Sequence, residues 1–134
     1  MLKPMRFALA GLLLLLAPMG LARDNAIRAI IQDQLEAFQT NDLDRAFSYA
    51  SPMIKGMFGN PTRFGQMVRD GYPMVWRPAD VHFGGVRELG EGRVQTVFFT
   101  DQSGAVFEAT YEMIRIDDAW QINGVVIRKA DLGA

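Results

Sequence analysis

Residues 38–53 read FQTNDLDRAFSYASPM, and this stretch decides the fold because it closes one helix, contains a second and opens a third. Asn41 tolerates the left-handed conformation that ends a helix, and Asp42 is a preferred N-cap for the next one. Ser51 precedes Pro52, and a residue before proline disfavours the helical backbone conformation, so the second helix should end before Ser51. Serine at the N-cap and proline at the first helical position then begin a further helix.

A longer helix is predicted before this stretch, over residues 24–40, with Asp24 as its N-cap. Its apolar residues form one stripe at helical spacing, which contains Ile27, Ile30, Ile31, Leu35 and Phe38. After residue 53, Asn60 and Pro61 repeat the Ser-Pro arrangement. They predict a helix that ends at Gly71.

The second half of the chain changes to the alternation typical of strands. Strands are predicted near residues 80–83 and at 93–100, 105–116 and 119–127, with a bulge at Gly84 and Gly85 and turns at residues 89–92 and 117–118. Short turns imply antiparallel pairing. The predicted fold class is α+β, with N-terminal helices packed on a curved antiparallel sheet of about four strands.

The strand at residues 105–116 separates an apolar face from a polar one. Phe107, Ala109, Tyr111 and Met113 alternate with Glu108, Thr110 and Glu112. The apolar group should pack on the helices, together with Trp120 and Ile122. Val106, Ile114, Val125 and Ile127 are predicted on the polar face, which makes it too apolar for full exposure. This face is either solvated or pairs with a second copy of the chain, and we take a homodimer through it as a hypothesis.

The first 22 residues have the pattern of a secretory signal peptide. Lys3 and Arg6 precede an apolar run at residues 7–17, and Gly20 and Ala22 predict cleavage before Arg23. The run is about half of the roughly 20 residues that a membrane span needs, although a retained anchor helix is the alternative. We expect a Sec-type signal, one domain over residues 23–134, and a periplasmic or secreted location with no membrane partner after cleavage.

Composition excludes several partners and sites. Without Lys3 and Arg6, the 14 basic residues become 12 against 15 acidic ones, a net charge of −3. The arginines form no basic stripe, so nucleic acid is not an expected partner. The sequence has no cysteine and one histidine, His82, and so lacks the ligand sets of the common zinc sites. We expect no metal and no cofactor.

Several motifs resemble a known family. A helix, NDLDRAFSYASP, further helices and a curved sheet are similar to the cone-shaped nuclear transport factor 2-like (cystatin-like, SnoaL-like) superfamily. The motifs NPTRFGQMVRDGYPMVWRPADVHFG and DDAWQINGVVI resemble the bacterial domain of unknown function 4864. The resemblance extends from Asp24 to Arg128. It implies a cone with a cavity at its wide end, which serves catalysis in some members and only binding in others.

The resemblance also implies where a catalytic base would lie. The superfamily's isomerases and cyclases use a carboxylate near the end of the second helix, where this sequence has Tyr49, Ala50, Ser51 and Pro52. Neither Ser51 nor Pro52 acts as a base at neutral pH, so no catalytic residue is predicted. His82 beside Asp80 can form an acid-base pair, but a lone strand histidine is more often exposed or satisfied.

The aromatic segment at residues 72–78 is the predicted ligand site. Its two prolines predict an extended conformation near the mouth of the cone. We predict four ligand-binding residues, Tyr72, Trp76, Arg77 and Tyr111, for an aromatic or acidic small molecule whose carboxylate Arg77 would clamp. The alternative is that Tyr72 and Trp76 only close the core. Met53, Met57, Met67 and Met74 offer an adaptable lining that suits either role.

We therefore expect a non-catalytic domain in the periplasm that binds a small molecule or another protein. The alternative is a ketosteroid-isomerase-like or hydratase-like enzyme that uses an acid in the cavity or His82. A cavity acid or histidine with a shifted pKa would favour the enzyme. A cavity filled by side chains would favour a purely structural module.

Overall fold

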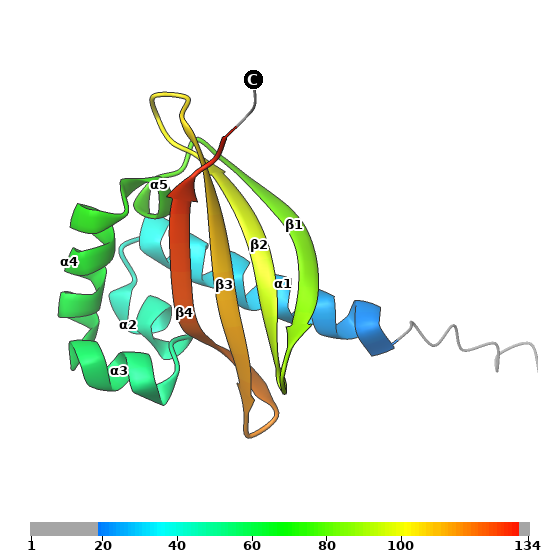
Figure 1. Ribbon diagram of the computed structural model, residues 1–134. Coiled ribbons are helices and arrows are strands. Elements are labelled where there is room, and N and C mark those ends of the chain that lie inside the picture. The colour runs from blue at the N-terminus through cyan, green and yellow to red at the C-terminus, as the bar shows by residue number, and fades with distance from the viewer. Residues whose placement is uncertain (1–18, 132–134) are drawn as a thin grey trace, which may run out of the picture.

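The computed structural model describes residues 19–131, which form helices followed by an antiparallel sheet (Figure 1). The helices are α1 (Met19–Gln39), α2 (Leu43–Ser48), α3 (Pro52–Phe58), α4 (Pro61–Gly71) and α5 (Pro73–Trp76). The strands are β1 (Asp80–Leu89), β2 (Gly92–Thr100), β3 (Val106–Ile116) and β4 (Ala119–Lys129). The predicted signal peptide lies outside the described residues, except for positions 19–22 at the start of α1.

The first helix begins earlier than predicted. The expected N-cap, Asp24, lies inside α1, which starts at Met19. Residues 20–23 include Leu21, Ala22 and Arg23, which are strong helix formers, so nothing local stops the helix at Asp24. The buried residues described in this helix begin at Ile27, which has no exposed surface.

The junctions between the helices confirm the predicted caps. Asn41 has a φ of 57°, and the Asp42 carboxylate accepts a hydrogen bond from the backbone N–H of Arg45 at 3.2 Å. Ser51 and Asn60 cap α3 and α4 in the same way, each followed by a proline in the first turn. These residues satisfy N–H groups that a helix start leaves without partners.

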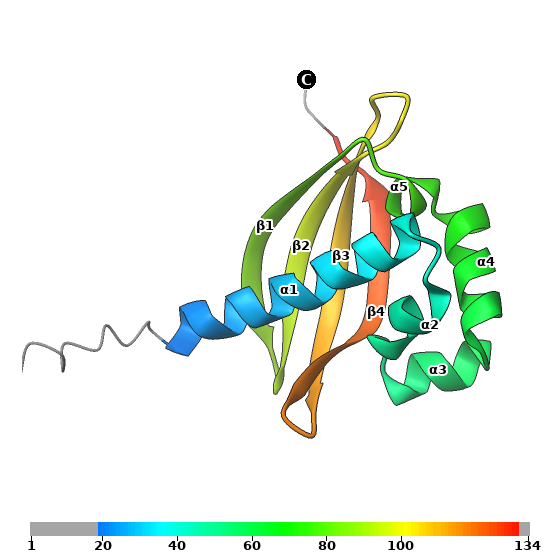
Figure 2. The same cartoon turned by 180° about the vertical axis from the view of Figure 1, so that it is seen from behind.

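The four strands pair in the order β1-β2-β3-β4, each antiparallel to the next. The predicted bulge in β1 is confirmed, because the pairing with β2 shifts between Phe83 and Val86. Asp117 and Asp118 both have positive φ angles and make the tight turn between β3 and β4. The sheet curves, and α1 crosses its concave face (Figure 2).

The core lies between α1 and the concave face of the sheet. From α1 it contains Ile27, Ile31, Leu35 and Phe38, and from the strands Val97, Phe99, Ala109, Tyr111, Met113, Trp120 and Ile122. The predicted core face of β3 and the positions of Trp120 and Ile122 are therefore confirmed. We call the opposite, convex side of the sheet the outer face; none of the described helices covers it (Figure 1).

A second bulge, in β4, corrects the prediction for the end of that strand. Met113 of β3 pairs with Ile122, whereas Glu112 pairs with Gly124, so Asn123 has no opposite residue. The extra residue reverses the alternation, and Val125 lies opposite Tyr111 on the concave side. Ile127, two residues after Val125, lies opposite Ala109 on the same concave side. The prediction that these two residues share the outer face was wrong.

The segment at residues 72–78 is not extended as predicted. It contains the short helix α5, with Pro73 in its first turn. Proline disfavours a helical backbone conformation in the residue before it, and Tyr72, with φ −136° and ψ 62°, is accordingly not helical. A proline at the first helical position starts a helix as readily as it fixes an extended chain, and here the helical turn forms.

Candidate functional site

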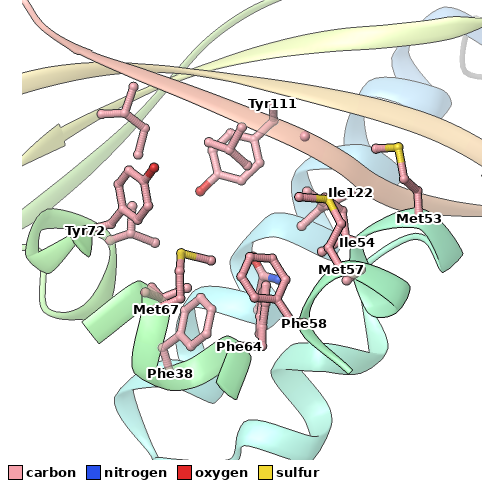
Figure 3. Close-up of a pocket in the computed structure, with 17 residues that line it drawn as sticks. Phe38, Met53, Ile54, Met57, Phe58, Phe64, Met67, Tyr72, Tyr111 and Ile122 are labelled. Atoms are coloured by element: carbon pink, nitrogen blue, oxygen red, sulfur yellow. The ribbon is translucent and has the colours of Figure 1, made fainter. Parts of the chain in front are cut away.

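A cavity of about 460 Å³ opens between the β4 side of the sheet and the short helices (Figure 3). Helices α3 and α4 form one wall, β3 and β4 form the other, and α1 contributes Gln34 and Phe38. This volume lies within the range of small-molecule sites in proteins. Side chains therefore do not fill the wide end of the fold.

The lining is apolar and contains no charged side chain. Its polar side chains are Gln34, Tyr72 and Tyr111, and the other lining residues are aliphatic, aromatic, methionine, alanine or glycine. The side-chain amide of Gln34 donates to the carbonyl of Ala46 at 3.1 Å. An ionic ligand would lose its hydration here without gaining a charged partner.

Helix α3 forms the outer wall of the cavity. None of its residues is buried, yet its apolar side chains Met53, Ile54, Met57 and Phe58 line the cavity (Figure 3). Met53 is 54% exposed and Met57 is 68% exposed, so both lie at the rim. Tyr72 and Val125 are also exposed lining residues. We call Met53, Met57, Tyr72 and Val125 the apolar rim.

The start of α3 is fixed to β4 beside the second bulge. The backbone N–H of Ser51 donates to the carbonyl of Ile122, and the N–H of Ile122 donates to the carbonyl of Tyr49, each at 2.8 Å. The Ser51 hydroxyl donates to Oδ1 of Asn123 at 2.7 Å and accepts from the N–H of Ile54 at 3.3 Å. These bonds hold the α3 wall at a defined distance from the sheet wall.

An aromatic cluster closes the helical side of the cavity. The ring of Phe64 in α4 lies 5.9 Å from that of Phe38, 5.4 Å from that of Phe47 and 5.7 Å from that of Phe58. Tilted and edge contacts at such distances stabilise aromatic packing. The cluster joins α1, α2, α3 and α4 around one end of the cavity.

Tyr111 places a hydroxyl group in the cavity wall. Its side chain is 1% exposed, lines the cavity and extends from β3 toward the helices (Figure 3). Among the described residues this hydroxyl has no hydrogen-bond partner, whereas the hydroxyl of Tyr49 donates to Asp33 at 3.3 Å. Burial raises the pKa of Tyr111 well above its ordinary value, so the phenol stays protonated.

The structure brings together two of the four predicted ligand-binding residues. Tyr72 lies at the rim and Tyr111 in the wall, and both hydroxyl groups point toward the space between them (Figure 3). Trp76 and Arg77 do not line the cavity. The helical turn of α5 directs Trp76 to α1, where its ring lies 5.6 Å from that of Phe38.

Arg77 bonds to the end of α1. Its guanidinium donates to the carbonyl of Phe38 at 2.8 Å and to Oδ1 of Asn41 at 3.2 Å, and it lies 4.6 Å from the Trp76 ring centre. A cation at a helix C-terminus satisfies free carbonyls and interacts favourably with the helix dipole. These contacts hold the guanidinium at the end of α1, outside the cavity in which it was predicted to clamp a carboxylate.

The residues considered for catalysis lie elsewhere. His82 is exposed on the outer face, where its ring lies 6.4 Å from that of Phe98. None of the residues that line the cavity is an acid or a histidine. Within residues 19–131, no three side chains of the metal-binding types come together, and no helix has the length and apolar character of a membrane span.

Sequence reasoning missed much of the lining. It considered Met53, Met57 and Met67 as an adaptable lining, and these methionines do line the cavity, whereas Met74 lies buried in the core. It missed Val125 and Ile127, although Gly124 beside Asn123 is the same kind of bulge signal as the glycines of β1. It also missed the unpartnered hydroxyl of Tyr111, which is apparent only in three dimensions.

The helices, the curved four-stranded sheet and the cavity at its wide side define a nuclear transport factor 2-like cone of the α+β class. A protein of this class and unknown function from Silicibacter pomeroyi DSS-3 is similar in structure, with a TM-score of 0.59 at 16% identity, over 83% of this chain and 98% of that one. Another, from Shewanella baltica OS155, has a TM-score of 0.57 at 13% identity, over 83% and 96% of the two chains. At these identities the likeness concerns the fold alone.

The sequence match is more specific. The chain belongs to the family described as "Domain of unknown function (DUF4864)", whose model matches residues 21–132. This confirms the resemblance drawn from the motifs in residues 60–84 and 117–127. No curated protein matches the chain in sequence.

Proposed function

We propose that this domain binds an uncharged, mainly apolar small molecule in the cavity, without catalysing a reaction on it. The observation that carries the proposal is a cavity of about 460 Å³ whose lining has no charged side chain. Burial of apolar ligand surface contributes roughly 25 cal/mol per Å², so such walls favour a hydrocarbon ligand.

The apolar rim supports the same proposal. Exposed large apolar side chains in the described part of the chain are Met53, Met57, Tyr72, Leu89, Val125 and Val126. The first three and Val125 surround the cavity. Exposed apolar groups that gather around an apolar cavity are typical of a ligand entrance. Methionine side chains adapt to ligands of different shape, which suits the α3 side of this entrance.

The experiment is a titration with N-phenyl-1-naphthylamine, a neutral dye whose fluorescence rises in apolar surroundings. We expect saturable binding to the wild-type chain. Met67→Trp should weaken it by about tenfold or more because the larger side chain occupies the cavity. Leu89→Trp is the matched control, since Leu89 is exposed at the end of β1 and does not line the cavity. Equal binding by all three proteins would exclude the cavity as the site.

Export to the periplasm is part of the proposal and derives from the pattern of residues 1–22 alone. Its test is the intact mass of the chain recovered from the periplasm, which should equal that of residues 23–134. Such cleavage removes positions 19–22 of α1 and leaves the buried side chains that are described in this helix, the first of which is Ile27. The full-length mass, or a chain found only in the cytoplasm, would contradict export.

The homodimer through the outer face is also proposed. Without Val125 and Ile127, this face still carries Val106, Ile114 and Val126, and Val126 is 71% exposed. Light scattering at micromolar concentration should give twice the monomer mass. A monomer mass would remove the dimer and leave the cavity proposal unaffected, because the two surfaces lie on opposite sides of the sheet.

A further inference from the structure

The hydroxyl of Tyr111 is the one polar group that β3 places in the described cavity lining. A phenol hydroxyl is a hydrogen-bond donor, and one that faces an apolar cavity takes its partner from the contents of the cavity, either water or a ligand. Nearly all buried polar groups in proteins find partners. In this chain, the hydroxyl of Tyr111 lacks one among the described residues, although the side chain is 1% exposed and lines the cavity.

The neighbouring side chains do not supply the missing acceptor. Gln95 lies opposite Tyr111 on β2, and its amide nitrogen donates to the carbonyls of Gly84 at 3.0 Å and Thr96 at 2.8 Å. Its Oε1 also has no partner, so the Tyr111 hydroxyl does not bond to it. On the other side, the residue opposite Tyr111 is Val125, which has no polar side-chain atom. Gln34 and Tyr72, the other polar side chains of the lining, make no hydrogen bond to this hydroxyl. Its acceptor therefore comes from the contents of the cavity, either water or a ligand.

We infer that the ligand carries one uncharged oxygen acceptor, such as a carbonyl or ether oxygen, which receives a hydrogen bond from Tyr111, on an otherwise hydrocarbon body. This inference rests on the proposed function. A carboxylate ligand does not fit, because the lining offers it no cation. The rim residues Met53, Met57 and Val125 contact the hydrocarbon part, so the oxygen-bearing end enters first.

The test uses three molecules of the same shape: 2-acetylnaphthalene, its hydrocarbon analogue 2-isopropenylnaphthalene, and 2-naphthoate. Their affinities are measured by equilibrium dialysis against the wild-type chain and Tyr111→Phe. We expect the variant to bind the ketone about 3- to 10-fold more weakly, the effect of one neutral hydrogen bond, and the hydrocarbon within about twofold of wild type. The naphthoate should bind the wild type more weakly than the ketone does.

Tyr49→Phe is the matched control, because it removes a tyrosine hydroxyl that bonds to Asp33 outside the cavity. It should leave both affinities unchanged. Thermal unfolding verifies that each variant is folded, and Tyr111→Phe should retain the wild-type Tm because it removes a hydroxyl without a protein partner.

The outcomes separate the two proposals. If Tyr111→Phe lowers the affinity for both neutral ligands equally, or for neither, the proposed preference for an oxygen acceptor is wrong, while the proposal of binding in the cavity stands. If neither neutral molecule binds the wild type, both proposals are contradicted. Naphthoate binding tighter than the ketone would also overturn the inference.

Discussion

The hydroxyl of Ser51 donates a 2.7 Å hydrogen bond to Oδ1 of Asn123 and so joins the N-cap of α3 to the bulge of β4. Each side of this bond shapes the cavity. The N-cap begins the helix that carries Met53 and Met57, and the bulge turns Val125 toward the concave side. One contact between residues 72 positions apart in sequence thus sets the spacing of two cavity walls.

Ser51→Ala should lower the free energy of unfolding by about 1–3 kcal/mol. The variant loses the cap of α3 and leaves Oδ1 of Asn123 without this donor. Urea unfolding measures the change. Ser48→Ala is the control, because the Ser48 hydroxyl is exposed and bonds only to the carbonyl of Arg45 in its own helix. Equal stability of the two variants would contradict a special role for Ser51.

The bulge at Asn123 predicts opposite effects for neighbouring residues of β4. Ile127→Asp should destabilise the fold by about 2–4 kcal/mol, because it places a carboxylate on the half-buried concave side without a partner. Val126→Asp should change stability by less than about 0.5 kcal/mol, since Val126 is 71% exposed on the outer face. Both are measured by urea unfolding at a concentration where light scattering gives a monomer. The reverse order would mean that the strand has no bulge.

Arg77→Ala should lower the free energy of unfolding by about 1–2 kcal/mol, because the carbonyl of Phe38 and Oδ1 of Asn41 lose their donor. Arg69→Ala provides the comparison, since Arg69 is exposed and pairs only with its neighbour Asp70. An unchanged Arg77→Ala stability, combined with weaker binding of an anionic ligand, would instead support the carboxylate clamp predicted from the sequence.

Asp101 predicts a pH dependence in the turn before β3. Its Oδ1 accepts from the Ser103 hydroxyl at 2.6 Å and from the N–H groups of Ser103 and Ala105 at 2.9 Å, and these bonds lower the pKa of Asp101 below its ordinary 3.8. A depressed folded-state pKa adds stability above the unfolded-state pKa, and this stability is lost as the pH falls through the folded-state pKa.

The stability difference between wild type and Asp101→Ala should therefore be constant near neutral pH and shrink as the pH falls below 3.8. Urea unfolding at a series of pH values measures it. A difference that stays unchanged down to about pH 2 would contradict a stabilising role of the Asp101 carboxylate.

The sequence predicted the fold well where local chemistry determines the backbone. Asn41, Asp42, Ser51 and Asn60 each satisfy or redirect neighbouring backbone groups, and the structure confirms all four positions. It failed where two conformations suit the same residues. Proline begins a helix or extends a chain, so the segment after Tyr72 was predicted extended and forms α5.

The cavity was only partly predictable. Tyr72 and the methionines of α3 line it. Arg77 and Trp76 instead contact Phe38 of α1, because the α5 turn directs them there. A single extra residue, Asn123, moved Val125 to the cavity side. Gly124 beside Asn123 is a sign of this bulge in the sequence, but a glycine inside a strand does not by itself prove one. The role of the Tyr111 hydroxyl depends on neighbours distant in sequence.

Intermolecular nuclear Overhauser effects would test the central claim, that the cavity takes up an apolar molecule, most directly. The protein is labelled at its isoleucine, valine and methionine methyl groups, and N-phenyl-1-naphthylamine is added unlabelled. We expect contacts from the dye to the methyl groups of Ile122, Val125 and Met67, which line the cavity, and none to Val126 on the outer face. Contacts to Val126 and Ile114 instead, or none at a saturating concentration, would contradict it.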